Sequence, residues 1–480
     1  MSNDKAAQLI PTHSHLFGLT RRDTTLSLNV LPSEIIAHIF SFACNVRASA
    51  CPAKIDSDNA DRESHPFPKE PVVLSHTCSY WQQITVNQAS LWSHIDVYPA
   101  RFHDPILLER SETYAARSAE HLLDVHVVIP MLDAYNDDID TYPFGFAFLA
   151  SVAHRIRSLN VQSASGSPSQ NFCCLVVSNC LAKAVSGKLT EVSIETVIVA
   201  RWNLLSFPVL ATRTDTTGPI FDKTLLTVTT LRLEYAWIGW TCKIYHGLTE
   251  LRLFGGPLFQ QSRLVSTLRS SPQLRVLELG GLARFVAERS PIGSVRLDSL
   301  ETLILGRIRD NHLKSILRLI EPGTRPLSLS ILNPYQGSSN LISKDELQRF
   351  ITRSNIVRLC ANQFQSYSRL AEVLSIVPTV RVLAVDHFSC GLVNEDAVQS
   401  HMLTLNSLYV LNSTQPYSFT WPSIEAFVKR HHVRQLTLWK YDFKRSWFDE
   451  TGYLPVNLKS ICPVVKLVPD TEPNPAEGWC

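Results

Sequence analysis

The cysteines are the first residues to consider, because clustered thiolates bind metals and act as nucleophiles. Three of the 11 cysteines lie close together, at Cys173, Cys174 and Cys180. No two cysteines in the sequence have CxxC spacing, and no histidine follows the cluster at the distance found in zinc fingers. The spacing therefore favours buried thiols over a metal site.

The acidic residues and the search for catalytic motifs likewise give little support for metal binding or catalysis. Asp56, Asp58 and Asp61 resemble part of a calcium loop, but the glycine at the sixth position and the glutamate at the twelfth are missing. The sequence contains no Gly-x-Ser-x-Gly elbow, no P-loop and no Gly-x-Gly-x-x-Gly turn. We therefore expect a protein that is not an enzyme and has no metal or cofactor, although a triad assembled from distant residues stays open.

The composition is that of an ordinary globular protein. The 480 residues are 45% hydrophobic and 18% charged, and 45 basic residues against 43 acidic ones give a net charge of +2. A balance this even predicts neither nucleic acid nor an anionic membrane as the main partner. The length suits two to four domains, or one small domain followed by a long repetitive one.

The sequence also indicates a compartment. The N-terminus, Met1 to Thr12, has no apolar segment typical of a secretory signal. The longest apolar run, Phe144 to Ala153, has ten residues, which is too short to span a bilayer. With an odd number of scattered cysteines, we expect reduced thiols and a location in the cytoplasm, the nucleus or both.

From about residue 154 one apolar pattern recurs every 20 to 28 residues. The pattern is apolar-x-x-apolar-x-apolar, and its last two apolar positions are two residues apart, on one face of a short strand. Its clearest copies are Leu248/Leu251/Leu253, Leu274/Leu277/Leu279, Leu300/Leu303/Leu305, Val380/Leu383/Val385, Leu405/Leu408/Val410 and Val433/Leu436/Leu438.

The segments between these copies have helical spacing. Examples are Leu264 and Leu268, then Leu347 with Phe350 and Ile351, and later Ile424 with Phe427 and Val428. A strand and a helix about every 25 residues is the pattern of leucine-rich repeats, whose units bury their apolar faces by stacking. Glycines stand where asparagine usually follows the strand, so we expect irregular repeats. An ordinary α/β domain is the alternative.

The N-terminal part predicts a small helical unit. Pro32 and Glu34 favour a helix start, and Ile35, Ile36, Ile39 and Phe40 then follow on one wide face. After a polar insert, Leu74, Cys78 and Trp81 recur at i, i+4 and i+7 on a second helix, and Leu91 and Trp92 close the unit. A core of about ten apolar residues is marginal alone, so this unit should need a partner or the following domain.

These blocks, in this order, resemble an F-box, specifically the F-box-like variety common in fungal proteins. The resemblance covers Leu28 to Val97 and rests on Leu-Pro-x-Glu-Ile-x-x-x-Ile-Phe, Leu-Ser-x-x-Cys-x-x-Trp and Leu-Trp-x-x-Ile. The polar insert departs from the compact pattern, and Ser79 and Tyr80 stand between Cys78 and Trp81, where many members have arginine after the cysteine.

The resemblance implies a docking module that binds the Skp-family adaptor, and through it a cullin, in a ubiquitin ligase. The implied adaptor-binding residues are Leu31, Pro32, Glu34, Ile35, Ile39, Phe40, Cys78, Trp81, Leu91 and Trp92, some of which would instead belong to the internal core. The attached repeats would recruit an unidentified protein substrate. Candidate exposed positions between the inward leucines are Arg252, Glu278, Ile304 and Thr437.

The predicted fold class is thus a small all-helical F-box-like module followed by an irregular leucine-rich-repeat solenoid. The predicted parts are a flexible arm (1–27), the F-box-like domain (28–97) with a mobile insert (45–71), a connector or degenerate first repeats (98–153), the solenoid (154–468) and a flexible proline-containing tail (469–480). Two alternatives to a ligase receptor remain. One is an adaptor-binding protein without a role in ubiquitin transfer, and the other is a repeat scaffold capped by the helical unit.

Overall fold

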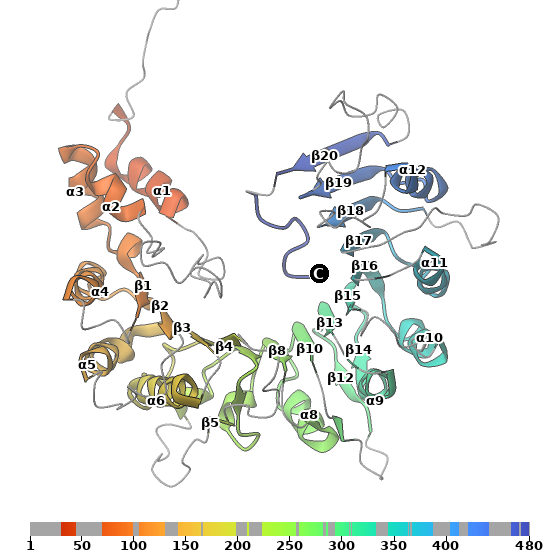
Figure 1. Ribbon diagram of the computed structural model, residues 1–480, viewed down its shortest axis with the longest axis horizontal. Coiled ribbons are helices and arrows are strands. Elements are labelled where there is room, and N and C mark those ends of the chain that lie inside the picture. Colours follow the sequence, from red (N-terminus) through yellow and green to blue (C-terminus); the bar gives the residue numbers. More distant parts are fainter. Residues whose placement is uncertain are drawn as a thin grey trace, which may run out of the picture.

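The structure is a computed structural model, and its elements form one continuous arc (Figure 1). It describes residues 30–44, 70–98, 105–129, 143–164, 167–197, 209–210, 223–255, 259–281, 285–286, 293–306, 308, 310–332, 344–362, 364, 367–386, 404–411, 421–440, 462–469 and 472–479. The predicted N-terminal arm and nearly all of the predicted polar insert lie outside these residues.

Fourteen strands of the described chain form one parallel sheet, in which the spatial order of the strands follows their order in the sequence. The strands are β1 (His94–Val97), β2 (Leu123–Ile129), β3 (Ile156–Ala164), β4 (Glu191–Val197), β6 (Thr230–Glu234), β8 (Glu250–Phe254), β10 (Val276–Gly280), β13 (Thr302–Gly306), β15 (Leu327–Leu332), β16 (Ile356–Asn362), β17 (Val382–Asp386), β18 (Ser407–Leu411), β19 (Gln435–Trp439) and β20 (Val464–Val468). The sheet therefore begins at His94, within the predicted F-box-like domain. Its second strand, β2, lies within residues 98–153, for which the sequence left open a connector or degenerate first repeats.

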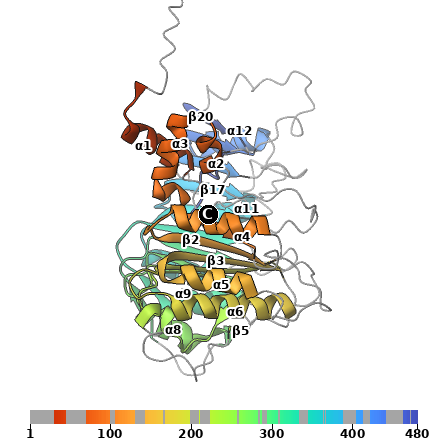
Figure 2. The same cartoon turned by 90° about the vertical axis from the view of Figure 1, so that its left-hand side faces the viewer.

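Helices alternate with these strands and lie on the outer side of the arc, and Figure 2 shows α4, α5 and α6 in front of the sheet. A helix is about 10 Å wide whereas neighbouring strands are about 4.8 Å apart, so a helix layer on one face bends the sheet away from it. The outer helices are α4 (Pro105–Arg117), α5 (Pro143–Val152), α6 (Ser167–Lys183), α8 (Gln261–Arg269), α9 (Asp310–Leu319), α10 (Lys344–Thr352), α11 (Tyr367–Ile376) and α12 (Trp421–Arg430).

Short elements complete the outer layer and the N-terminal end. Two-stranded pairs join β5 (Val209–Leu210) to β7 (Trp237–Ile238), β9 (Phe259–Gln260) to β11 (Phe285–Val286) and β12 (Val295–Leu297) to β14 (Ile320–Pro322), with 3₁₀ turns η6 (Ala153–Arg155) and η7 (Lys243–Tyr245) between larger elements. The N-terminal helices are α1 (Ser33–Cys44), α2 (Glu70–Ser75), α3 (Ser79–Asn87) and the 3₁₀ turn η3 (Ala89–Trp92).

The main core lies between the sheet and the outer helices. In β8, for example, Leu251 and Leu253 are fully buried on the helix side, whereas Arg252 between them points to the concave side. The same alternation in successive strands gives one continuous core cluster that runs from Ile36 in α1 to Cys462 just before β20. The strand–helix alternation predicted from the spacing is confirmed, and the protein is mixed α/β with one long parallel sheet.

Glycines end several strands because the backbone there turns into the left-handed region. Gly255 and Gly281, directly after β8 and β10, have φ values of +73° and +60°. A Cβ atom at Gly255 would overlap the ring of Tyr235. The Gly255 N–H donates to the Gly280 carbonyl at 2.9 Å, and the Gly281 N–H donates to the Gly306 carbonyl at 2.9 Å. These turns explain why glycine occupies the position after the strand.

Two expectations about local structure are wrong. Leu74, Cys78 and Trp81 do not share one helix, because Cys78 has extended dihedrals and its sulfur accepts a hydrogen bond from the Trp81 N–H at 3.5 Å, which caps α3. The tail was expected to be flexible, yet residues 472–479 pack on the sheet, with Ala476 fully buried. A proline-rich composition does not reveal that a packing surface is within reach.

Candidate protein-interaction surfaces

The first candidate surface is an apolar stripe on α1, at the end of the arc before β1 (Figure 1). Ile35, Ile39 and Phe42 are 50%, 41% and 71% exposed. Their i, i+4 and i+7 spacing places them on one face of the helix. We call these three residues the α1 stripe. Val73 in α2 and Val30 just before α1 are further exposed apolar residues of this helical unit.

The inner face of the same helices is firmly packed. Ile36 and Phe40 of α1 are 2% and 3% exposed, and the Phe40 ring meets that of Trp81 edge-on at 4.9 Å. Trp92 is fully buried, and its indole N–H donates to the Thr85 carbonyl at 2.8 Å. The ring of Trp92 also meets that of Tyr114 in α4 at 4.9 Å, which ties the helical unit to the arc. The α1 stripe is therefore presented by a fixed support.

The predicted adaptor-binding residues separate into three groups by burial. Those with exposed side chains are Pro32, Glu34, Ile35 and Ile39. Those at the margin are Leu31, whose carbonyl accepts from the Tyr80 hydroxyl at 3.4 Å, together with Cys78 and Trp81. Those in the core are Phe40, Leu91 and Trp92.

The core group contains the residues for which the sequence left open a place in the internal core instead of a contact with a partner. Phe40, Leu91 and Trp92 are 3%, 6% and 0% exposed, so they support the unit from within. Sequence reasoning also missed Phe42, which continues the spacing of Ile35 and Ile39 by one more turn. That continued spacing was the available signal.

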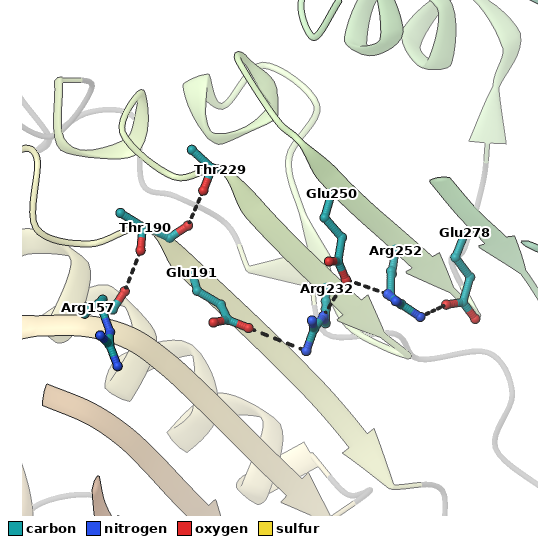
Figure 3. A network of polar contacts seen from close by, with 8 residues as sticks. All are labelled: Arg157, Thr190, Glu191, Thr229, Arg232, Glu250, Arg252 and Glu278. Carbon is teal, nitrogen blue, oxygen red and sulfur yellow. Dashed lines mark hydrogen bonds and ion pairs between the residues drawn. The ribbon is translucent and has the colours of Figure 1, made fainter. Parts of the chain in front are cut away.

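The second candidate surface is the concave side of the sheet, where charged side chains from neighbouring strands form a ladder (Figure 3). Arg232 contacts Glu191 at 3.5 Å and Glu250 at 2.8 Å. Arg252 contacts the same Glu250 oxygen at 2.6 Å and Glu278 at 2.9 Å. The ladder thus spans β4, β6, β8 and β10, with three carboxylates against two guanidinium groups.

Burial and pairing set the charge states within the ladder. Burial alone would raise the pKa of Glu250, but its hydrogen bonds and attraction to Arg232 and Arg252 outweigh this and hold the pKa below its ordinary value. Burial likewise disfavours the charge on Arg252, and its contacts with Glu250 and Glu278 outweigh that penalty and raise its pKa. Glu250 and Arg252 are therefore ionised at neutral pH, and their charges pair with each other and with neighbouring members of the ladder.

The four predicted substrate-binding residues all lie on the concave side and in one row of the strand register. Arg252 and Glu278 have side chains that are 25% and 22% exposed, and they are ion-paired with each other. Ile304 and Thr437 are only 4% and 2% exposed, so the expectation that they are exposed is wrong. Side chains on the inner side of a curved sheet converge, so a residue flanked on both sides loses access to solvent.

The same row begins with a buried polar group in the first two strands. Asp96 in β1 is fully buried and its Oδ1 atom lies 3.0 Å from Nδ1 of His126 and 3.3 Å from Nε2 of His94. Burial would raise the pKa of Asp96, but the hydrogen bonds and charges of His126 and His94 outweigh it and lower the pKa to about 2. Among the described residues no group of three histidine, cysteine or acidic side chains is placed to hold a metal ion.

The cysteine cluster singled out in the sequence contributes buried thiols to α6. Cys173 and Cys180 are 2% and 1% exposed and both are free. Burial raises the pKa of the Cys180 thiol to about 12, so it stays protonated and unreactive.

The expectation that all thiols are reduced is not met, because Cys360 in β16 is disulfide-bonded. The aspartates of the calcium-like motif lie outside the described residues.

Comparison with known proteins adds no relative to this picture. A scan against protein-family models finds no family that matches the chain, and a search of curated proteins finds no matching protein. In the part of the chain that the structure describes, no helix is both long and apolar enough to cross a membrane.

Proposed function

We propose that the chain is the substrate receptor of a cullin-type ubiquitin ligase, in which the helical unit is an F-box-like module that binds the Skp-family adaptor. The observation that carries the proposal is the α1 stripe. Ile35, Ile39 and Phe42 expose a contiguous apolar face on α1, and the block Leu31-Pro32-Ser33-Glu34 at the start of this helix is the one most typical of the F-box. Exposed apolar patches of this kind mark protein-binding sites.

The support beneath the stripe favours docking without rearrangement. Phe40 and Trp92 fill the interior of the unit, and Trp81 packs against Phe40 at its margin. Trp92 connects the unit to α4, so a partner can cover the stripe while this core stays intact. A preformed apolar surface binds tightly because little side-chain or backbone entropy is lost on association. Binding energy should concentrate in a few such anchors.

The arc supports the second half of the proposal, a leucine-rich-repeat-like domain that holds the substrate. Parallel strands in sequence order, many of them followed by an outer helix and separated by about one repeat length, are typical of the architecture of that class. Such a receptor supplies no nucleophile or base. It holds the substrate beside a ubiquitin-charged enzyme and so raises their effective concentration.

The experiment is a reconstitution with purified Skp-family adaptor and cullin, analysed by gel filtration. The full chain should co-elute with both proteins, and an Ile35→Glu/Ile39→Glu variant should elute alone. Glutamate is a good helix former, so these exposed changes should leave α1 folded. The matched control is Leu226→Glu on the arc, because Leu226 is 48% exposed and Ile35 is 50% exposed.

Two outcomes would contradict the proposal. One is a well-folded wild-type chain that does not co-elute with the adaptor, and the other is a stripe variant that co-elutes as the wild type does. A second readout distinguishes a ligase receptor from the alternative, an adaptor-binding protein without a role in ubiquitin transfer. A receptor should direct cullin-dependent ubiquitin transfer to a bound partner, whereas the alternative should bind the adaptor and transfer none.

A further inference from the structure

The C-terminal half of the concave side carries an apolar patch that the outer helices do not touch. Its members are Cys360 in β16, Ala384 in β17, Leu411 in β18, Trp439 in β19 and Val468 in β20. These residues form a cluster separate from the main core, and each is at most 7% exposed. We call these five residues the concave patch. On the concave side of a sheet, burial this complete requires a cover.

The cover is the C-terminal tail of the same chain, which turns back from β20 into the arc (Figure 1). Ala476 is fully buried in the cluster of the concave patch. The ring of Trp479 meets that of Tyr409 edge-on at 6.1 Å. The indole N–H of Trp439 donates to the Glu472 carbonyl at 3.0 Å. Three contacts of different kinds thus fix residues 472–479 to three parts of the patch and its border.

The tail has the internal structure of a short peptide ligand. The Asn474 side-chain oxygen accepts from the Ala476 N–H at 2.9 Å, and the Trp479 N–H donates to the Ala476 carbonyl at 3.3 Å. Pro473 and Pro475 restrict the chain before it binds, which lowers the entropy lost on binding. Glu472, Glu477 and Gly478 stay exposed. The contacts therefore come from one small residue, one aromatic ring and one backbone carbonyl.

We propose that the concave patch is a peptide-binding surface and that the tail is its intramolecular occupant. The partner that it fits is a protein segment of the same chemistry: a proline-containing turn that buries a small residue and places an aromatic ring three positions later. Such a segment must displace the tail, whose short connection to β20 gives it an effective concentration on the order of millimolar. This inference does not depend on adaptor binding.

The test uses a chain that ends at Pro469 and a fluorescent peptide of residues 470–479. The peptide leaves out Cys480, so its binding cannot depend on a disulfide bond to the chain. The truncated chain should bind the peptide saturably, and the full chain should bind it at least tenfold more weakly. A peptide with Trp479→Ala should also bind the truncated chain at least tenfold more weakly. A scrambled peptide should not bind.

Variants of the truncated chain locate the binding surface. Tyr409→Ala should weaken peptide binding at least tenfold because it removes the partner of the Trp479 ring. Lys466→Ala, in the same row of the strand register but exposed, is the matched control and should leave binding unchanged.

Folding of each chain is followed by thermal unfolding. A folded truncated chain that does not bind the peptide overturns the proposal. A truncated chain that loses its cooperative transition overturns it as well, because the tail is then part of the fold and not a ligand. The full chain with Trp479→Ala gives a separate readout, since its weakened tail should admit the free wild-type peptide, and failure to do so while folded counts against the proposal.

Discussion

The side chains on the concave side of the sheet are stabilised differently in its two halves. In the first half, from β4 to β10, charged residues of adjacent strands pair with one another and stay partly open to solvent. In the second half, from β16 to β20, the apolar residues of the concave patch line the same side of the sheet and the tail covers them. Charged side chains satisfy each other across strands, whereas an apolar surface in water is stabilised only by a cover.

The α1 stripe is apolar, like the second half of the concave side, but it is open to solvent, like the first half. Ile35, Ile39 and Phe42 are apolar and between 41% and 71% exposed, and no segment of the described chain buries them as the tail buries the concave patch. In the proposed function, the adaptor supplies the cover for this apolar surface.

The largest effect on the free energy of unfolding is expected in the concave patch, which the tail covers. Trp439→Ala should lower the free energy of unfolding by about 3 kcal/mol, because Trp439 is 7% exposed and its removal leaves a cavity beneath the tail. Val464→Ala, in the neighbouring strand β20 and 52% exposed, should change the free energy by less than about 0.5 kcal/mol. Urea unfolding measures both. Equal effects would mean that the tail does not cover the patch.

An intermediate effect on the free energy of unfolding is expected at Asp96 in β1. The pKa of Asp96 in the folded protein is about 2 and its ordinary value is 3.8, so ionised Asp96 stabilises the fold above about pH 4. That contribution, about 2 kcal/mol at 1.36 kcal/mol per pKa unit, should be lost as the pH falls through 2.

Asp96→Asn isolates this contribution. Unfolding free energies measured from pH 5 to pH 2 should fall less steeply for the variant than for the wild type. Asp298→Asn is the matched control, because Asp298 has a side chain that is 63% exposed. Parallel curves for wild type and Asp96→Asn would contradict the assignment of a stabilising carboxylate to β1.

The smallest effect is expected in the ladder. Glu278→Gln removes one end contact, to Arg252, and should cost about 0.5 kcal/mol. Glu250→Gln removes contacts to both Arg232 and Arg252 and should cost more, about 1 kcal/mol. Both costs should shrink in 1 M salt. If Glu278→Gln cost as much as Trp439→Ala, the contrast between the two halves would be lost.

The repeated strands and helices were predictable because their signal is local. Leu277 and Leu279, two residues apart, already place a strand face, and Leu347, Phe350 and Ile351 already place a helix face. The exposure of Ile304 and Thr437 was not predictable, because it depends on how strongly the sheet curves and on which segments cross it. Burial of the tail likewise depends on Ala476 reaching residues more than 60 positions earlier in the sequence.

The candidate site was predictable in part. The motif around Pro32 and Glu34 predicted the helix that carries the exposed stripe, but spacing alone could not separate the two apolar faces of that helix. Ile35 and Ile36 are neighbours in sequence, yet one is 50% exposed and the other 2%. Their difference follows from where Trp81 and the arc pack, and sequence periodicity on one short helix contains no information about that packing.

The most direct test of the central claim is a calorimetric titration of purified Skp-family adaptor into three full-length chains: the wild type, Ile39→Glu and Leu226→Glu. We predict that the wild type and Leu226→Glu bind with equal affinity, whereas Ile39→Glu binds on the order of 100-fold more weakly with an unchanged melting temperature. Equal affinity of all three chains, or no binding by a folded wild type, would contradict docking through the α1 stripe.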